Sequence, residues 1–161
     1  MTQKLTKASR KKTRKFLFQK IFARSFSDID ENLFQKSFFD DIFTFELDKP
    51  YMDEMYKLII EKESELIAVI EKYAPKFDIK SMNITAVIAI FIGLTEMLYL
   101  KEEIPMKVSI NEAVEMAKVY SSDSSKKIVN GILNNFYKDI ENHKKLDAPK
   151  PNSDFSFFSN T

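Results

Sequence analysis

The stretch from residue 84 to residue 95, ITAVIAIFIGLT, is apolar on nearly every side, and it restricts the fold more than any other part of the chain. Its β-branched residues would also suit a buried strand, but the apolar character continues to about residue 100, a length that favours a helix. The stretch is too short to span a bilayer. A helix that is apolar all round must be covered by other elements, so we expect a central buried helix over 83–100.

Helical spacing of apolar residues continues through most of the rest of the chain. The sequence SINE at 109–112 has the pattern of a capping box, with Ser109 as the N-cap and Glu112 at N3. SSDSS at 121–125 supplies a further N-cap. Pro75 is expected to end the predicted helix over 50–73. We therefore expect an all-α fold, a compact bundle of about six to seven helices. The other predicted helices cover 9–25, 30–45, 50–73 and 124–142.

The chain has two glycines, and Gly131 lies in KKIVNGILNNF at 126–136. Asn-Gly between apolar residues is a strong hairpin signal. The neighbouring apolar residues come in adjacent pairs, however, and this breaks the alternation that a strand requires. We expect a helix here, with Gly131 at a place where another backbone comes close.

Basic residues are concentrated at the N-terminus, although the net charge is only +1. Residues 1–24 contain nine Lys or Arg and no acidic residue, which leaves 16 basic residues against all 24 acidic ones in the rest of the chain. A basic segment on an acidic body is typical of an arm that binds polyanions. For a short charge run the simpler interpretation is a solvated tail.

The position of the basic residues on the first helix favours a polyanion. At 100° per residue, they extend the apolar stripe of the same helix instead of lying opposite it. Unpaired charges cannot be buried, so these turns must project beyond the body or face anions. Phosphates suit a helix N-terminus that carries Lys and Arg. The residues leave nucleic acid, a membrane surface and an acidic protein open as partners. The basic residues of the stripe are Arg10, Lys11, Arg14 and Lys15.

Several classes of function lack the residues that they require. The chain has no cysteine and a single histidine, His143, so we expect neither a metal site nor a cofactor. Glycine-rich phosphate loops and nucleophile elbows are absent, so we do not expect an enzyme. No apolar signal-peptide core is present, and we expect a soluble, cytoplasmic protein. Residues 146–161 are expected to form a flexible tail, in which FSFF at 155–158 is either part of a disordered end or a weak docking motif.

Two segments resemble the NusB transcription antitermination factor family. They are IPMKVSINEAVEMAKVYSSDSSKKIVNGIL at 104–133 and RKKTRKFLFQKIF at 10–22. The resemblance covers most of 9–142 and implies a compact all-α RNA-binding domain over 9–145, built from two small helical subdomains. A flexible basic N-terminus, 1–8, would precede it, and the tail would follow.

The resemblance also implies a function in ribosomal RNA transcription. Family members bind the boxA element of nascent leader RNA together with a small-subunit ribosomal protein, NusE, and join RNA polymerase and other Nus factors. Family members differ in oligomeric state, so a monomer and a homodimer both remain open. The RNA-binding residues carried over to this chain are Arg10, Lys11, Lys12, Arg14, Lys15, Phe22, Asp123, Ser124 and Ile128.

Three positions depart from the family pattern. Ile128 stands where a Phe is usual, Ser124 often has an acidic counterpart, and Phe91 lies near a common Arg. Ile128 cannot stack on a base as a Phe can. The sequence therefore also allows a protein–protein adaptor of this fold with weakened RNA binding, or a membrane-associated or nucleoid-associated factor that uses the basic arm unspecifically.

Overall fold

The computed structural model describes residues 9–26, 47–142, 151 and 154–158. These residues form helices and contain no β-strand, which confirms the predicted all-α class. The predicted helix over 30–45 lies outside the described residues. The helices are α1 (Arg10–Arg24), α3 (Lys49–Glu61), α4 (Glu63–Tyr73), the short 3-10 helix η1 (Ile79–Ser81), α5 (Ile84–Tyr99), α6 (Met106–Tyr120) and α7 (Asp123–Glu141).

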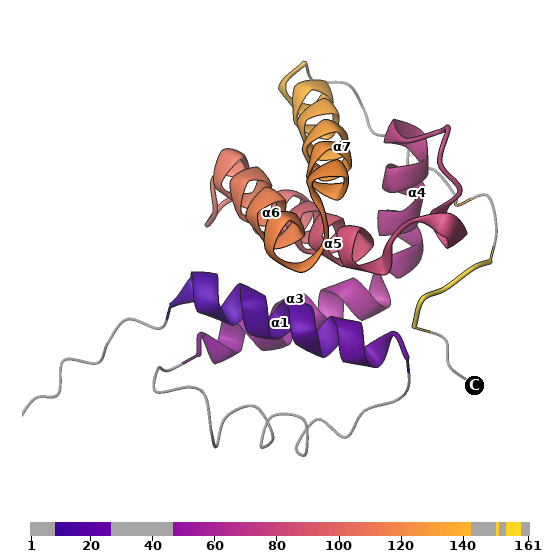
Figure 1. The fold of residues 1–161 in the computed structure, drawn as a ribbon. Coiled ribbons are helices and arrows are strands. Elements are labelled where there is room, and N and C mark those ends of the chain that lie inside the picture. The colour runs from indigo at the N-terminus through magenta and orange to yellow at the C-terminus, as the bar shows by residue number, and fades with distance from the viewer. Residues whose placement is uncertain (1–8, 27–46, 143–150, 152–153, 159–161) are drawn as a thin grey trace, which may run out of the picture.

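Helix α5 is the central helix of the bundle, as its sequence predicts. Every residue from Ala86 to Met97 is buried. In Figure 1, α1 and α3 lie side by side on one side of α5, and α4, α6 and α7 surround its other sides. This arrangement agrees with two small groups of helices packed into one compact bundle. Within the described residues, no helix is both long enough and apolar enough to cross a membrane.

The glycine at the close packing of helices is Gly93, not Gly131. A Cβ at Gly93 would lie 2.9 Å from Leu133 Cδ1 and 3.1 Å from Ala113 Cβ, so α6 and α7 approach α5 at this point. A Cβ at Gly131 would meet no atom within 4 Å. The expectation for Gly131 was therefore wrong, because the exposed side of α7 carries that residue.

Two predicted helix boundaries need correction. Helix α6 begins at Met106 with Pro105 as its N-cap, so Ser109 lies one turn inside the helix and is only 1% exposed. Ser109 bonds to another helix and does not act as the N-cap. The single helix predicted over 50–73 is two helices, because the chain changes direction at Lys62. The cap predicted in SSDSS is confirmed, since the Ser122 side chain accepts a hydrogen bond from the Ser125 N–H.

The described part of the C-terminal tail packs on the bundle. Phe158 is 3% exposed and belongs to the same core as the helices, and Phe155 and Phe157 pack against that core. For residues 154–158 the structure thus shows aromatic side chains packed on the core, where the sequence led us to expect part of a flexible tail. The physical reason is that the aromatic rings bury apolar surface, which offsets the cost of ordering the chain.

Candidate nucleic-acid interface

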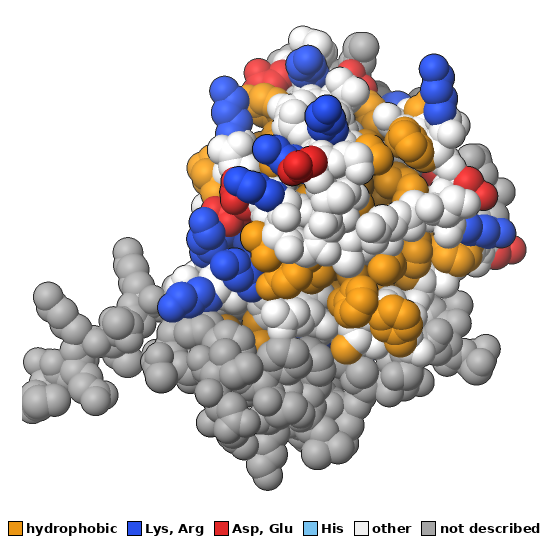
Figure 2. All heavy atoms as spheres, viewed as in Figure 1, with side chains coloured by type: hydrophobic (Ala, Val, Ile, Leu, Met, Phe, Trp, Pro, Cys, Tyr) orange, Lys and Arg blue, Asp and Glu red, His pale blue; other side chains and the backbone are white. Residues whose placement is uncertain are grey.

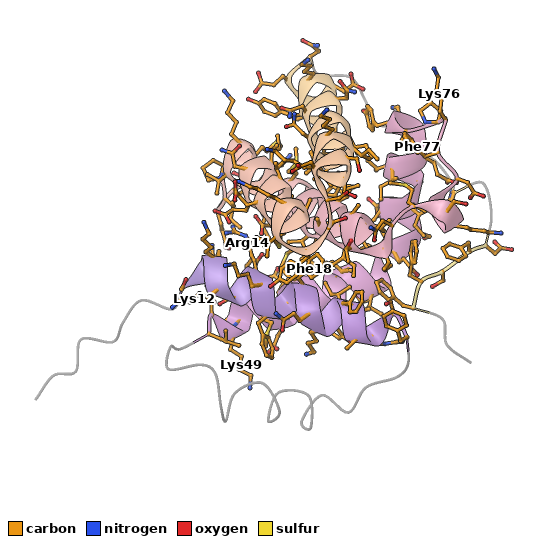
Figure 3. The ribbon with its side chains drawn as sticks, in the orientation of Figure 1. Lys12, Arg14, Phe18, Lys49, Lys76 and Phe77 are labelled. Atoms are coloured by element: carbon orange, nitrogen blue, oxygen red, sulfur yellow. The ribbon has the colours of Figure 1, made fainter. Side chains whose placement is uncertain are left out.

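Helix α1 divides its basic residues between solvent and the interior. Lys11, Lys12 and Lys15 are exposed, whereas Arg14 is only 4% exposed. Ser9 caps the helix by accepting a hydrogen bond from the Lys12 N–H. In Figure 3, Lys12 lies at the outer end of α1, and Arg14 lies between α1 and the helices above it. The predicted basic cluster is therefore two sets of residues with different partners.

Arg14 forms a buried ion pair with Glu96 of the central helix. Its Nε lies 2.7 Å from Glu96 Oε2, and its Nη2 lies 3.1 Å from Oε1. The Tyr51 hydroxyl donates to Glu96 Oε2, and the Ser109 hydroxyl donates to Oε1 at 2.7 Å. Burial alone would lower the pKa of the Arg14 guanidinium, but the hydrogen bond and charge of Glu96 raise it. Burial, followed by the charge of Glu96, raises the pKa of the Tyr51 hydroxyl.

The anion that faces Arg14 is therefore the carboxylate of Glu96, a group of the protein itself. The requirement that a buried charge must meet an anion holds, but the structure places Arg14 out of reach of a phosphate on the surface. The expectation that Arg14 contacts RNA is corrected accordingly: its guanidinium joins α1 to α5.

Arg10 is also engaged with the protein, although it remains partly accessible. Its Nη2 lies 2.8 Å from Asp48 Oδ2, and 35% of its side chain is exposed. Its guanidinium also lies over the ring of Tyr51, 4.9 Å from the centroid. Asp48 is the N-cap of α3, so this pair connects the first turns of α1 and α3.

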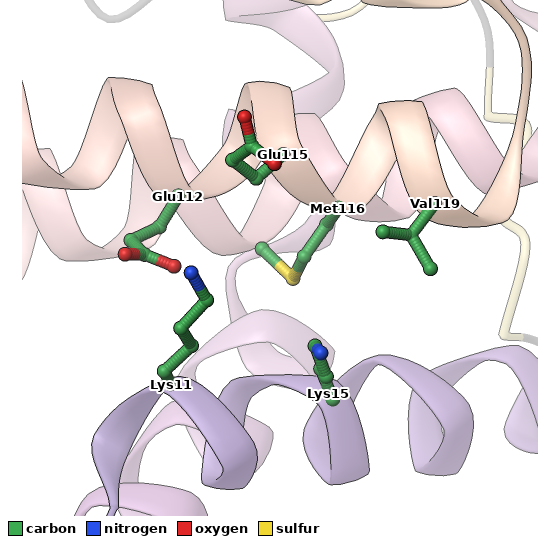
Figure 4. Close-up of a pocket in the computed structure, with 6 residues that line it drawn as sticks. All are labelled: Lys11, Lys15, Glu112, Glu115, Met116 and Val119. Atoms are coloured by element: carbon green, nitrogen blue, oxygen red, sulfur yellow. The ribbon is translucent and has the colours of Figure 1, made fainter.

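Lys11 and Lys15 line a hollow of about 130 Å³ between α1 and α6. In Figure 4, the two lysines extend from α1 toward residues of α6. Figure 2 shows Lys and Arg side chains gathered over this end of α1 and over α6. The α6 side of the hollow carries carboxylates as well, so a bound anion would lie nearer the lysines. The α6 residues of the hollow are Glu112, Glu115, Met116 and Val119.

Aromatic side chains continue along the same helix toward its C-terminal end. Phe22 is half-buried and packs edge-to-face on Phe26 at 5.0 Å between ring centroids, and Phe26 is 66% exposed. Phe18 stacks on Tyr120 at 4.4 Å, which holds the end of α6 against α1. No sequence motif singled out Phe26 as part of this surface, because it lies just beyond the C-cap Ser25; its contact with Phe22 places it there.

The remaining predicted residues lie on α7, in two places. Asp123 and Ser124 are exposed at the start of α7, shortly after Tyr120, whose ring stacks on Phe18 of α1. Ile128 is half-buried farther along α7, in a separate hollow of about 170 Å³ that it shares with Tyr73 and Phe77. Ile128 and the lysines Lys11 and Lys15 thus line different hollows. Among the described residues, no group of three or more His, Cys, Asp or Glu could hold a metal ion.

Comparisons with known proteins agree on one family. The model of the NusB family matches residues 11–138. A transcription antitermination protein NusB from Agathobacter rectalis is 35% identical over 130 residues, 80% of this chain and 98% of that protein. One from Chloroherpeton thalassium is 38% identical over 93 residues, which are 58% of this chain but only 44% of that protein. The solved structure of T. maritima NusB superimposes with a TM-score of 0.67 and 30% sequence identity, covering 83% of this chain and 93% of that one.

Proposed function

Because this chain belongs to the NusB family, whose model matches most of its length, we propose that it is a non-enzymatic transcription antitermination factor. Its ligand is boxA-type single-stranded RNA of ribosomal RNA leader transcripts. It binds this RNA together with the small-subunit ribosomal protein NusE, within an RNA polymerase complex that contains other Nus factors.

The observation that carries the proposal is a single stripe along α1. Lys11, Lys15 and Phe22 fall within about 40° of one another around the helix axis at 100° per residue, and Phe26, just beyond the C-cap Ser25, packs on Phe22. The lysines are exposed and the Phe22–Phe26 pair is partly exposed. Lysines bind phosphates as point charges, and aromatic rings stack on unpaired bases. A strand of RNA that follows this stripe would meet phosphate-binding groups first and the stacking group at Phe22 about two to three turns later.

The remaining residues extend the surface around this stripe. Lys12 stands beside it, Arg10 contributes its exposed part, and Asp123 and Ser124 border it from α7. Arg14 acts indirectly, because its bond to Glu96 fixes the turn that carries Lys11 and Lys15. Ile128 remains a proposed peripheral contact, reached only by RNA that continues over α7.

The test is binding to a boxA-like single strand and to a scrambled strand, with and without NusE, over a series of salt concentrations. Each phosphate contact to single-stranded nucleic acid contributes about 0.7 to the slope of log K against log salt. The variant Lys11→Ala with Lys15→Ala should therefore reduce the slope by about 1.4. Lys76→Ala with Lys101→Ala is the matched control, because these lysines are exposed on other elements, and it should leave the slope unchanged.

Equal loss in both double variants would contradict the assignment of the stripe. Preference for the boxA-like strand should also fall in Phe22→Ala, since stacking on one base contributes about 1–3 kcal/mol. Binding that is insensitive to sequence and steep in salt would instead indicate an unspecific polyanion surface.

One observation favours a second function, a protein–protein adaptor with weakened or unspecific RNA binding. Two of the predicted basic residues, Arg10 and Arg14, are paired with carboxylates of the protein itself. NusE binding without measurable RNA binding, even at low salt, would favour the adaptor and contradict the main proposal.

A further inference from the structure

Residues 154–158, DFSFF, pack against side chains of three helices, α1, α4 and α5. Phe91 of α5 is fully buried, and its ring lies 6.0 Å from that of Phe157 and 6.1 Å from that of Phe158, measured between centroids. In Figure 1 the segment is yellow and runs past the N-terminal end of α4 and the C-terminal end of α1. Two rings of the segment thus contact a buried aromatic side chain of the central helix.

Polar groups of two helices bind the backbone of the same segment. Glu63, at the start of α4, accepts the Phe157 N–H at 2.6 Å and also accepts the Ser156 hydroxyl. Arg24, at the end of α1, donates from Nη1 to the Phe158 carbonyl oxygen at 2.7 Å. Contacts to the backbone fix the position of a peptide, and pockets for its side chains select the sequence.

Glu63 shows that these contacts matter energetically. Its side chain is largely buried, with 7% of the residue exposed, and burial raises the pKa of its carboxyl group, although the bonds from the segment oppose that rise. A buried carboxylate is costly unless it is hydrogen-bonded. The segment supplies the donors, so the groove and the segment complement each other in both polar and apolar contacts.

We propose that Arg24, Glu63 and Phe91 form a peptide-binding groove whose ligand is a short segment of the type aromatic–Ser–aromatic–aromatic. Residues 154–158 are its resident ligand, bound in cis, and a peptide of the same chemistry binds in trans when the resident segment is released. The groove uses none of the residues assigned to RNA, so this proposal stands or falls independently of the proposed function.

The test uses the full-length chain and the peptide DFSFF, labelled with fluorescein at its N-terminus and amidated at its C-terminus. The variant Phe157→Ser with Phe158→Ser releases the resident segment. A tethered ligand acts at an effective concentration in the millimolar range, so the peptide should bind the released variant saturably and bind the unaltered chain at least about tenfold more weakly. A peptide with both terminal Phe replaced by Ser is the control. Adding Glu63→Gln or Phe91→Ala to the released variant should abolish binding.

Equal binding to both chains would overturn the proposal, and so would the absence of binding to a released variant whose helical circular dichroism is unchanged. A measurement on the unaltered chain does not depend on that variant folding. The Phe157 amide is bonded to a buried carboxylate, so its hydrogen exchange should be at least tenfold slower than in the free peptide. Exchange at the rate of the free peptide would also overturn the proposal.

Discussion

Glu96 accepts hydrogen bonds from three side chains on three different helices. Arg14 comes from α1, Tyr51 from α3 and Ser109 from α6. Replacing a buried ion pair with apolar residues can be neutral, but removing one partner leaves an uncompensated charge. This one carboxylate therefore holds Arg14 in the interior, whereas Lys11, Lys12 and Lys15 of the same helix remain exposed.

Arg14→Ala should lower the free energy of unfolding by about 3–5 kcal/mol, because it leaves Glu96 buried without its cationic partner. Glu96→Ala should cost a similar amount, and the double variant should cost less than the sum of the two. The measurement is urea unfolding followed by circular dichroism. Lys15→Ala, on the next residue but exposed, is the control and should stay within about 0.5 kcal/mol of the unaltered chain. Additive losses would mean that the two residues do not interact.

At the scale of helices, the two glycines of the chain predict opposite effects of the same substitution. Gly93→Ala brings a methyl group into contact with Leu133 and Ala113, and overpacking of this kind costs about 1–3 kcal/mol. Gly131→Ala adds a methyl group in open space and removes a mid-helix glycine, so it should stabilise the chain by about 0.5–1 kcal/mol. Thermal unfolding of the two variants side by side measures the contrast. A loss of stability in Gly131→Ala would contradict the packing described for α7.

The same helices show how far the sequence could predict the fold. Apolar periodicity located the described α-helices, with α3 and α4 predicted as a single helix, and the central position of α5, because burial on a helix leaves a regular trace in the sequence. It did not show the break at Lys62, since the apolar stripe continues across it. The SINE pattern misplaced the start of α6, because Pro105 begins the helix one turn earlier and buries Ser109.

For the candidate site, periodicity placed the basic residues on the core-facing side of α1 and required that they meet anions. It could not choose between phosphate and protein, because Arg14 and Glu96 are 82 positions apart in the sequence. The packing of residues 154–158 depends on Glu63 and Phe91, which are also far from them in the sequence. Both features arise from long-range packing, which local spacing does not record.

At the scale of the whole molecule, the buried apolar residues form one cluster with members from α1, α3, α4, α5, α6 and α7. The Glu96 network adds polar bonds between the pair α1 and α3 and the rest of the bundle. The two groups of helices thus share a core and a set of buried hydrogen bonds. Neither group buries its apolar face without the other, because α5 supplies surface to both.

This shared core predicts that the described helices unfold together. The slowest-exchanging amides of α1 and α7 should report the same free energy of opening in native-state hydrogen exchange, because global unfolding is then the only route to exposure for both. Agreement should extend to the free energy obtained from urea unfolding, as two-state behaviour requires. If the α1 amides opened at a free energy lower by more than about 1.4 kcal/mol, a tenfold difference in population, α1 would detach while the remaining helices stayed folded. The stripe proposed for RNA would then be carried by an element that forms and opens separately, and its lysines would not be held in position before RNA binds.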